Sequence, residues 1–191
     1  VYGGLSFYER KEVKDAIAYF RMTVNPNDDE AFRRVVNYPA RGIGNTTLEK
    51  LMSVATNNGI SLWETVNTFA AKELGVSATT YGRISKFVAM INGFAAKAGE
   101  LDAYALGNEI LEESGVRTEI VTDTSDLSRK ENLDELINAL YDFVAQETET
   151  NGSAENATIE NYLADVALLT GADKNDADKE KVSLMTIHSA K

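Results

Sequence analysis

Apolar residues recur every three or four positions along most of this 191-residue chain, in blocks separated by glycine, proline or helix-capping residues. This spacing places the apolar side chains on one face of a helix, so each block predicts an amphipathic α-helix. The β-branched stretch 116–124 lies between helical blocks and is compatible with a further short helix. The expected helices span residues 8–24, 29–37, 46–58, 61–74, 77–98, 101–114, 125–148 and 158–169.

One connection between two of these helices is unusually tight: the stretch from Asn37 to Leu51 reads NYPARGIGNTTLEKL. Gly42 and Gly44 flank Ile43, and glycine tolerates the positive φ angles and the close backbone approach that a bend requires. The isoleucine between them can point inward and fix the turn to a core. We therefore predict a hairpin between two helices.

The start of the helix after this hairpin is a candidate anion site. Asn45 or Thr46 is predicted to cap it, and the first backbone N–H groups of a helix have no partner within the helix. Such groups bind anions, so a nucleic-acid phosphate is the expected ligand. The alternative is a glycine-containing connection that binds nothing. The basic and hydroxyl side chains around this start are Arg41, Thr46, Thr47 and Lys50.

Charge is distributed unevenly along the chain. The net charge is −11, yet residues 1–50 hold eight Lys/Arg and seven Asp/Glu, whereas the remaining residues hold 11 and 23. A surface for a polyanion is therefore expected in the first quarter of the chain, and the acidic remainder would repel DNA from the wrong surface. Basic residues there also fit the alternative of a solvated helix face. On the exposed faces of the predicted helices these are Arg10, Lys11, Lys14, Arg33 and Arg34.

Composition excludes several kinds of site. The chain has no cysteine, which rules out disulfides and thiolate metal sites, and one histidine is too few for an ordinary histidine-based metal centre. We find no signal peptide and no apolar run near the roughly 20 residues that a membrane span needs. A cytoplasmic protein with no metal of its own and no membrane partner is expected. The single tryptophan, Trp63, fits a core position better than a base-stacking role.

The two ends of the chain differ from its middle. Residues 171–181 are charged and poor in apolar residues, which is typical of a linker, and residues 182–187 alternate in a pattern that predicts a strand. The candidate partner for this strand within the chain is the strand end at Val1 and Tyr2. Both ends therefore suggest pieces of one sheet-containing domain, with a helical domain inserted between them.

Three sequence blocks, in this order, resemble superfamily 1A DNA helicases of the UvrD, PcrA and Rep kind. They are GGLSFYERKEVKD at residues 3–15, RGIG at residues 41–44 and VSLMTIHSAK at residues 182–191. The similarity covers essentially the whole chain, and the three blocks together make it specific. In that family two RecA-like domains, 1A and 2A, hold ATP between them and move along single-stranded DNA in the 3′ to 5′ direction.

The resemblance implies a division of the chain into three segments. Residues 1–24 correspond to the part of domain 2A that leads in, residues 25–178 to the helical insertion called 2B, and residues 179–191 to the returning 2A strand that opens motif V. The expected fold is thus mainly α: a helical 2B-type insertion domain with short β stubs from a RecA-like α/β domain at both ends.

The resemblance also implies roles for individual residues. Residues 41–47 match the family's Gly-Ile-Gly element, which grips duplex phosphates without reading sequence, so Gly42, Ile43 and Gly44 join the predicted phosphate contacts. Two further groups match segments along the single strand: the 2A helix block and motif V, which also lies near the ATP cleft. The alternative for His188 is a histidine at a strand end whose hydrogen bonds are satisfied within the fold. The residues that match these segments are Arg10, Lys14, Thr186, His188 and Ser189.

The chain lacks the motifs for ATP hydrolysis. It contains no Walker A glycine loop, no Walker B carboxylates and no arginine-finger motif, so we expect no catalytic residue in it, and the resemblance assigns ATP and Mg²⁺ to the full-length protein. Expected partners are DNA at a junction of duplex and single strand, the helicase domains 1A, 1B and 2A, and repair proteins. Two alternatives remain open: a protein-interaction and autoinhibitory module with negligible DNA affinity, and part of a RecB/AddA-like helicase-nuclease.

Overall fold

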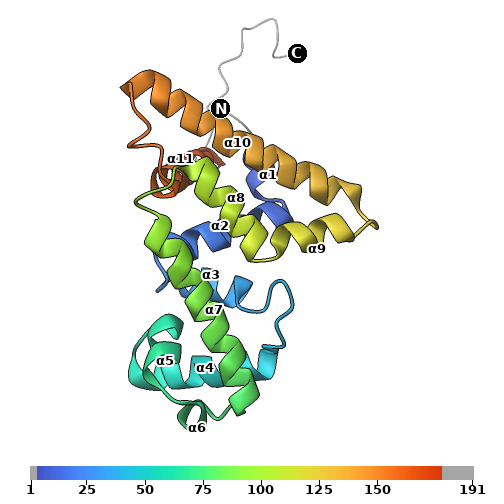
Figure 1. The fold of residues 1–191 in the computed structure, drawn as a ribbon, viewed down its shortest axis with the longest axis vertical. Helices are drawn as coiled ribbons and strands as arrows, with labels where there is room; N and C mark the ends of the chain where they lie inside the picture. Colours follow the sequence, from blue (N-terminus) through green and yellow to red (C-terminus); the bar gives the residue numbers. More distant parts are fainter. Residues whose placement is uncertain (1–3, 178–191) are drawn as a thin grey trace, which may run out of the picture.

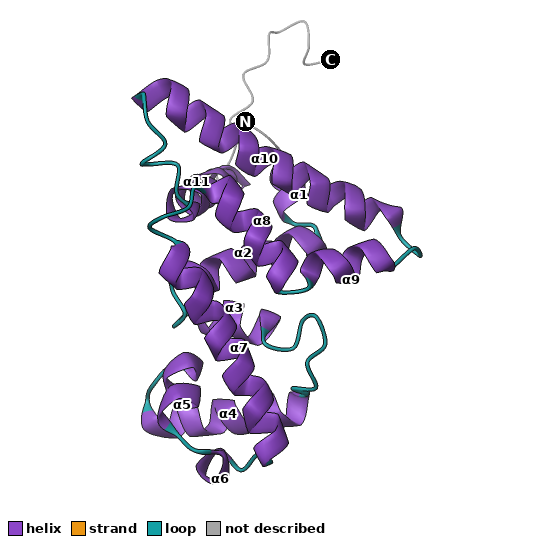
Figure 2. Ribbon diagram, in the orientation of Figure 1, coloured by secondary structure: helices purple, strands orange, loops and turns teal. Residues whose placement is uncertain are grey.

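The computed structural model describes residues 4–177, and within this range the chain forms helices joined by turns and loops, with no strand (Figure 1, Figure 2). The prediction of a mainly helical chain is confirmed for this part. The strands predicted at residues 1–2 and 182–187 lie outside the described residues. The helices are α1 (Leu5–Tyr8), α2 (Lys11–Val24), α3 (Asp29–Val35), α4 (Asn45–Asn58), α5 (Leu62–Thr68), α6 (Ala71–Leu74), α7 (Ala78–Lys97), α8 (Ala103–Glu113), α9 (Val116–Thr122), α10 (Leu127–Asn151) and α11 (Ile159–Ala177).

Two of the predicted helices differ from their expected bounds. The helix expected at residues 8–24 begins at Lys11 as α2, because the extended backbone of Arg10 (φ −67°, ψ 140°) separates it from α1, of which only Tyr8 lies in the expected range. The helix expected at residues 61–74 is interrupted at Phe69 (φ −101°, ψ 140°), and Glu73 caps α6 by accepting a backbone N–H at 2.8 Å. Phe69 packs partly buried against the core. This tertiary contact is invisible in the helical spacing of the sequence.

The last two helices are longer than expected. α10 continues past its expected end at residue 148 and ends at Gly152, which has a φ of 69°. α11 continues as far as Ala177 into the stretch 171–181, which we predicted as a linker. An exposed helix turn can be as polar as a loop, so composition alone did not distinguish the two.

α2 lies at the centre of the core. It contacts α3, α7, α8, α10 and α11, and its side chains Val13, Tyr19 and Phe20 are fully buried. Phe32 of α3 and Phe87 of α7 meet edge to face, with ring centroids 5.6 Å apart. One cluster of buried apolar side chains extends through these helices. The chain therefore encloses an apolar core of its own.

α7 links the two ends of the molecule. In Figure 1 the helices α4, α5 and α6 lie at one end of the long axis, α8, α9 and α10 lie toward the other, and α7 runs between them. With 20 residues, α7 is about 30 Å long at the usual rise per residue. Within residues 4–177, the helices are all too short or too polar to cross a membrane.

The close approach of α8 to α10 and α2 predicts different effects for one substitution at two glycines. A Cβ at Gly107 would lie 2.6 Å from Cδ1 of Leu140 and 3.6 Å from Cζ of Phe20, whereas a Cβ at Gly93 on α7 meets no atom within 4 Å. We expect Gly93→Ala to raise the free energy of unfolding by about 0.5–1 kcal/mol, because alanine favours a helix. Overpacking should leave Gly107→Ala about 1–3 kcal/mol less stable than Gly93→Ala. Urea unfolding followed by circular dichroism measures both, and equal stabilisation would contradict this packing.

Candidate nucleic-acid interface

One asparagine holds the hairpin between α3 and α4 in shape. Oδ1 of Asn37 accepts hydrogen bonds from the backbone N–H groups of Arg41 at 2.8 Å and Ile43 at 3.0 Å. The Ile43 side chain is 1% exposed, so it points into the core as the sequence predicts. The loop is thus fixed from within, while Gly42 and Gly44 lie exposed on the surface.

The two glycines of the hairpin are there for different reasons. Gly42 has a φ of 72°, and a Cβ there would lie 2.5 Å from Nη1 of Arg83, which donates to the Gly42 carbonyl at 3.1 Å. Gly44 is extended (φ −79°, ψ 176°), and a Cβ there meets nothing within 4 Å. The expected positive φ is therefore confirmed at Gly42 and wrong at Gly44, whose place is the N-cap of α4.

The first turn of α4 presents backbone N–H groups without partners. The N-cap Gly44 has no side chain to accept them, so the expectation that Asn45 or Thr46 caps the helix is wrong. The first helical bond runs from the N–H of Leu48 to the Gly44 carbonyl at 3.1 Å. The N–H groups of Asn45, Thr46 and Thr47 have no acceptor among residues 4–177. Unpaired N–H groups and the helix dipole both attract negative charge, so this helix start suits an anion.

Arg41 forms its hydrogen bonds inside the molecule. Nη1 donates to the carbonyls of Val35 at 3.0 Å and Tyr38 at 2.9 Å, and Nη2 donates to the Tyr19 hydroxyl at 2.7 Å and the Ser114 carbonyl at 2.9 Å. One guanidinium thereby joins the hairpin to α2, to the end of α3 and to the end of α8. The assignment of Arg41 as a phosphate contact stays a prediction, and its bonds give it an anchoring position.

Two aromatic rings lie beside this guanidinium. Its Cζ is 5.8 Å from the ring centroid of Tyr19 and 5.6 Å from that of Phe87. Burial raises the pKa of Tyr19 to about 12, against the opposing charge and hydrogen bond of Arg41. Tyr19 therefore remains a neutral hydroxyl, which accepts from Arg41 and donates to the Tyr38 carbonyl.

A cation from α7 also lies at the hairpin. Arg83 reaches the Gly42 carbonyl, and the exposed Lys86 follows one turn further along the helix. The predicted contact Lys50 is exposed too, but its Nζ donates to the Gly75 carbonyl at the end of α6, at 2.7 Å. Arg83 and Lys86 are not among the residues predicted from the sequence. Their spacing of three residues predicts a shared helix face, but only the fold brings that face to the hairpin.

The two arginines of α3 contact their own surroundings. Nε of Arg34 lies 2.7 Å from Oδ1 of the buried Asp15. Burial raises the pKa of the Asp15 carboxyl, and the charges of Arg34 and Lys11 oppose this rise. Arg33 is exposed, and its Nε donates to the Asp29 carbonyl at 3.3 Å. Of these two, Arg33 is the one with a charge that faces solvent.

The predicted single-strand contacts are separate from the hairpin. Nη1 of Arg10 lies 3.2 Å from Oε2 of Glu135 on α10, and Nζ of Lys14 lies 3.2 Å from Oε2 of Glu9. The structure therefore groups Arg10 and Lys14 with α10 and the junction between α1 and α2. The remaining predicted contacts lie outside the described residues: Thr186, His188 and Ser189.

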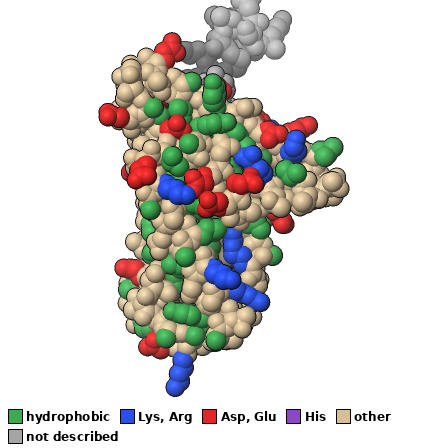
Figure 3. All heavy atoms as spheres, in the orientation of Figure 1, with side chains coloured by type: hydrophobic (Ala, Val, Ile, Leu, Met, Phe, Trp, Pro, Cys, Tyr) green, Lys and Arg blue, Asp and Glu red, His purple; other side chains and the backbone are tan. Residues whose placement is uncertain are grey.

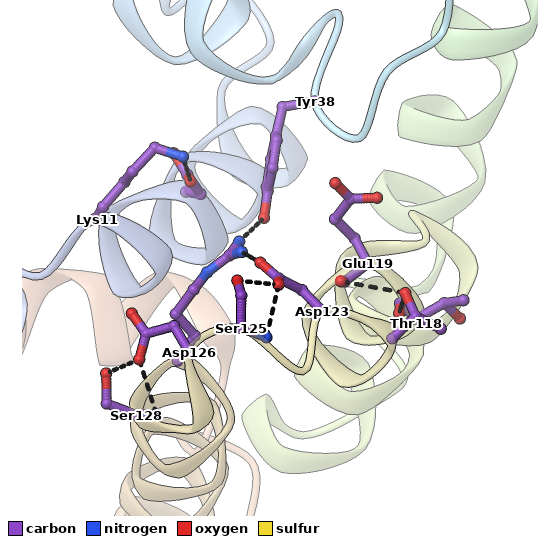
Figure 4. Close-up of polar contacts among 11 residues, drawn as sticks. Lys11, Tyr38, Thr118, Glu119, Asp123, Ser125, Asp126 and Ser128 are labelled. Carbon is purple, nitrogen blue, oxygen red and sulfur yellow. Dashed lines mark hydrogen bonds and ion pairs between the residues drawn. The ribbon is translucent and has the colours of Figure 1, made fainter.

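A second set of contacts joins the hairpin loop to the turn between α9 and α10 (Figure 4). Nη2 of Arg129 donates to the Tyr38 hydroxyl at 3.2 Å, and Nη1 lies 2.6 Å from Oδ2 of Asp123. Asp123 also accepts the N–H of Ser125 at 3.1 Å. On the other side, Nζ of Lys11 lies 5.3 Å from the centroid of the Tyr38 ring. The loop is thus tied at Tyr38 to both α2 and the α9–α10 turn.

Charge is divided between the two ends of the molecule. Residues 36–98 carry six Lys/Arg and three Asp/Glu, whereas residues 99–177 carry four and nineteen. In Figure 3 basic side chains gather in the half that contains α4 and α7, and acidic side chains dominate the half that contains α8 and α10. The basic surface therefore extends beyond the first 50 residues, where the sequence placed it, and includes α7.

The chain matches the family model of the UvrD-like helicase C-terminal domain over residues 1–191. It is 32% identical over 193 residues to DNA helicase II of Escherichia coli (strain K12) and 35% identical over 199 residues to the ATP-dependent DNA helicase PcrA of Bacillus subtilis (strain 168). Each alignment covers 100% of this chain and 26% of the relative. The chain thus spans about a quarter of the length of the curated relatives it matches.

The bonds of Arg41 predict that Arg41→Lys destabilises the fold. A lysine ammonium lacks the planar fork of donors, so carbonyls at the ends of α3 and α8 would lose their partner. We expect the free energy of unfolding to fall by about 2–4 kcal/mol, from losing one or two hydrogen bonds to a charged group. Arg33→Lys, at an exposed position, should change it by less than about 0.5 kcal/mol. Equal urea midpoints for the two variants would contradict the anchoring position of Arg41.

Proposed function

The chain belongs to the family of UvrD-like helicase C-terminal domains, and from this membership we propose that it is part of an ATP-dependent 3′ to 5′ DNA helicase. In that protein the hairpin and the first turn of α4 bind the phosphates of duplex DNA and so regulate unwinding. The observation that carries this proposal is the row of unpaired N–H groups at Asn45, Thr46 and Thr47, beside the exposed Gly42.

The proposed contact is with the DNA backbone. The N–H groups of the first turn donate to phosphate oxygens, and the hydroxyls of Thr46 and Thr47 are further donors. Gly42 and Gly44 carry no side chain, which lets the phosphate approach the backbone closely. Groups of this kind do not read base edges, so binding is expected to be independent of sequence.

The cations around the hairpin add the long-range attraction. Arg83 and Lys86 on α7 are exposed, and Arg83 is held at the hairpin by its bond to the Gly42 carbonyl. Lys50 adds a further positive charge one turn into α4. Two or three neutralised phosphates fit this set of cations.

ATP hydrolysis is not assigned to these residues. The sequence contains no Walker-type glycine loop. Among residues 4–177, no group of three or more His, Cys, Asp and Glu side chains could hold a metal ion. The residues present therefore do not fit ATP with Mg²⁺. In our proposal hydrolysis belongs to other parts of the helicase, whose relatives carry names such as ATP-dependent DNA helicase.

A second candidate function rests on the acidic half of the molecule. Residues 99–177 carry nineteen Asp/Glu against four Lys/Arg, a balance that repels DNA and favours basic protein surfaces. On this alternative the chain is a protein-interaction and autoinhibitory module that contacts other helicase domains or repair proteins, and it has negligible DNA affinity of its own. The binding experiment below separates the two candidates.

We expect the chain to bind a duplex with a 3′ single-stranded tail, with an affinity that falls with salt at a logarithmic slope of about −2 to −3. Fluorescence anisotropy of the labelled DNA measures this at two salt concentrations and with two unrelated sequences. Gly42→Ala should weaken binding about tenfold, the equivalent of one or two lost hydrogen bonds, because alanine is strained at a φ of 72°. No binding at low salt, or equal binding by folded Gly42→Ala, would favour the interaction module instead.

A matched pair of lysines tests the contribution of α7. Lys86→Ala removes an exposed positive charge near the hairpin, and Lys130→Ala removes an exposed one on α10. The two variants have the same net charge; they differ in the position of the lost charge and in the exposed ion pair of Lys130 with Asp134, whose Oδ2 lies 3.6 Å from Nζ. We expect Lys86→Ala to reduce the salt slope by about 1 and Lys130→Ala to leave it unchanged. The same slope for both variants would show that α7 does not face the DNA.

A further inference from the structure

Two tyrosines lie side by side on the acidic half of the surface. Tyr104 of α8 is 37% exposed and Tyr141 of α10 is 58% exposed. Their rings meet edge to face, with centroids 5.5 Å apart and planes at 78°. Neither hydroxyl has a hydrogen-bond partner among the residues that the structure describes. An exposed aromatic pair with free hydroxyls is typical of a binding surface, because such rings offer both an apolar face and a polar edge.

The pair borders a hollow between α8 and α10. The hollow has a volume of about 450 Å³ and opens to solvent. Apolar and hydroxyl groups of α10 line it beside the two rings, and a carboxylate of each helix completes it. We call it the tyrosine hollow, and its main lining residues are Asp102, Tyr104, Tyr141, Val144, Thr148 and Glu149.

The charge around the tyrosine hollow is negative and unpaired. Asp102 caps α8 through one oxygen, which accepts the N–H of Ala105 at 2.8 Å. Glu149 is exposed, and no cation of the described chain pairs with it. Arg117, which contacts α8, is already paired with Glu112 at 3.3 Å and with Asn108 at 2.7 Å. A partner must therefore bring its own positive charge.

We propose that the tyrosine hollow is a docking site for an arginine-rich segment of a partner protein. A guanidinium is planar and weakly hydrated, so it stacks on a tyrosine ring more readily than a lysine ammonium does. Its remaining donors can pair with the carboxylates of Asp102 and Glu149. Nucleic acid is a poor occupant, because phosphates would face the acidic residues of α8 and α10.

This inference is independent of the proposed DNA contact. The tyrosine hollow is made by α8 and α10, whereas the phosphate contact is made by the hairpin, α4 and α7. Tyr141→Ala should therefore leave the anisotropy of the tailed duplex unchanged. A negative result for one proposal therefore does not contradict the other.

The test uses fluorescein-labelled hexa-arginine as the probe, with a hexa-citrulline peptide as its neutral match. We expect Tyr141→Ala to weaken hexa-arginine binding by about three- to thirty-fold, the range of one cation–π contact. Tyr141→Phe keeps the ring and should bind like the wild type. Leu168→Ala removes a side chain that is 73% exposed on α11 and should have no effect.

A second pair of variants tests the carboxylate. Glu149→Gln should weaken hexa-arginine binding and reduce its salt dependence, whereas Glu131→Gln, at an exposed position elsewhere on α10, should not. Circular dichroism confirms that each variant is folded. The proposal is overturned if hexa-arginine does not bind, if hexa-citrulline binds equally well, or if all five variants bind alike, since uniform binding reflects net charge alone.

Discussion

One half-buried guanidinium ties the hairpin to the helices around it. Val35 is the last residue of α3 and Ser114 follows the last residue of α8, and the final carbonyls of a helix have no partner within it. Arg41 donates to both carbonyls and to the Tyr19 hydroxyl of α2. A positive charge at a helix C-terminus is also favourable to the helix dipole. The same side chain thus satisfies carbonyls at the ends of two helices and holds the loop that leads into the candidate interface.

Much of the helical pattern could be predicted from spacing and capping residues. α7 and α8 lie within one residue or two of their expected bounds, and α9 forms in the β-branched stretch. Ser61 and Glu64 form a capping box at the start of α5. Predictions from the local sequence were wrong where a contact with a residue distant in the sequence determines the structure. The break at Phe69 depends on its packing, and the presence of Arg83 at the hairpin depends on how α7 crosses it.

The type of candidate site was predicted from the sequence, but only some of its contacts were. The inward Ile43 and the positive φ of Gly42 follow from the sequence Gly-Ile-Gly. The side chain of Arg41 could not be assigned from sequence, because a basic residue beside an anion site suits either a phosphate or a set of internal carbonyls. Its five acceptors come from segments as far away as Ser114. Lys50 likewise turned out to contact the end of α6.

The length of α7 explains how a chain with a net charge of −11 can approach a polyanion. The helix measures about 30 Å, whereas the Debye length is about 8 Å at physiological ionic strength. A duplex at the first turn of α4 is therefore screened from the acidic residues at the far end of α7, such as Glu109 and Glu113 beside Lys97. Because positive and negative charge lie at opposite ends, the molecule also has a permanent electric dipole moment. The field of DNA exerts a torque on this dipole, which turns the basic end toward the duplex before the first contact forms.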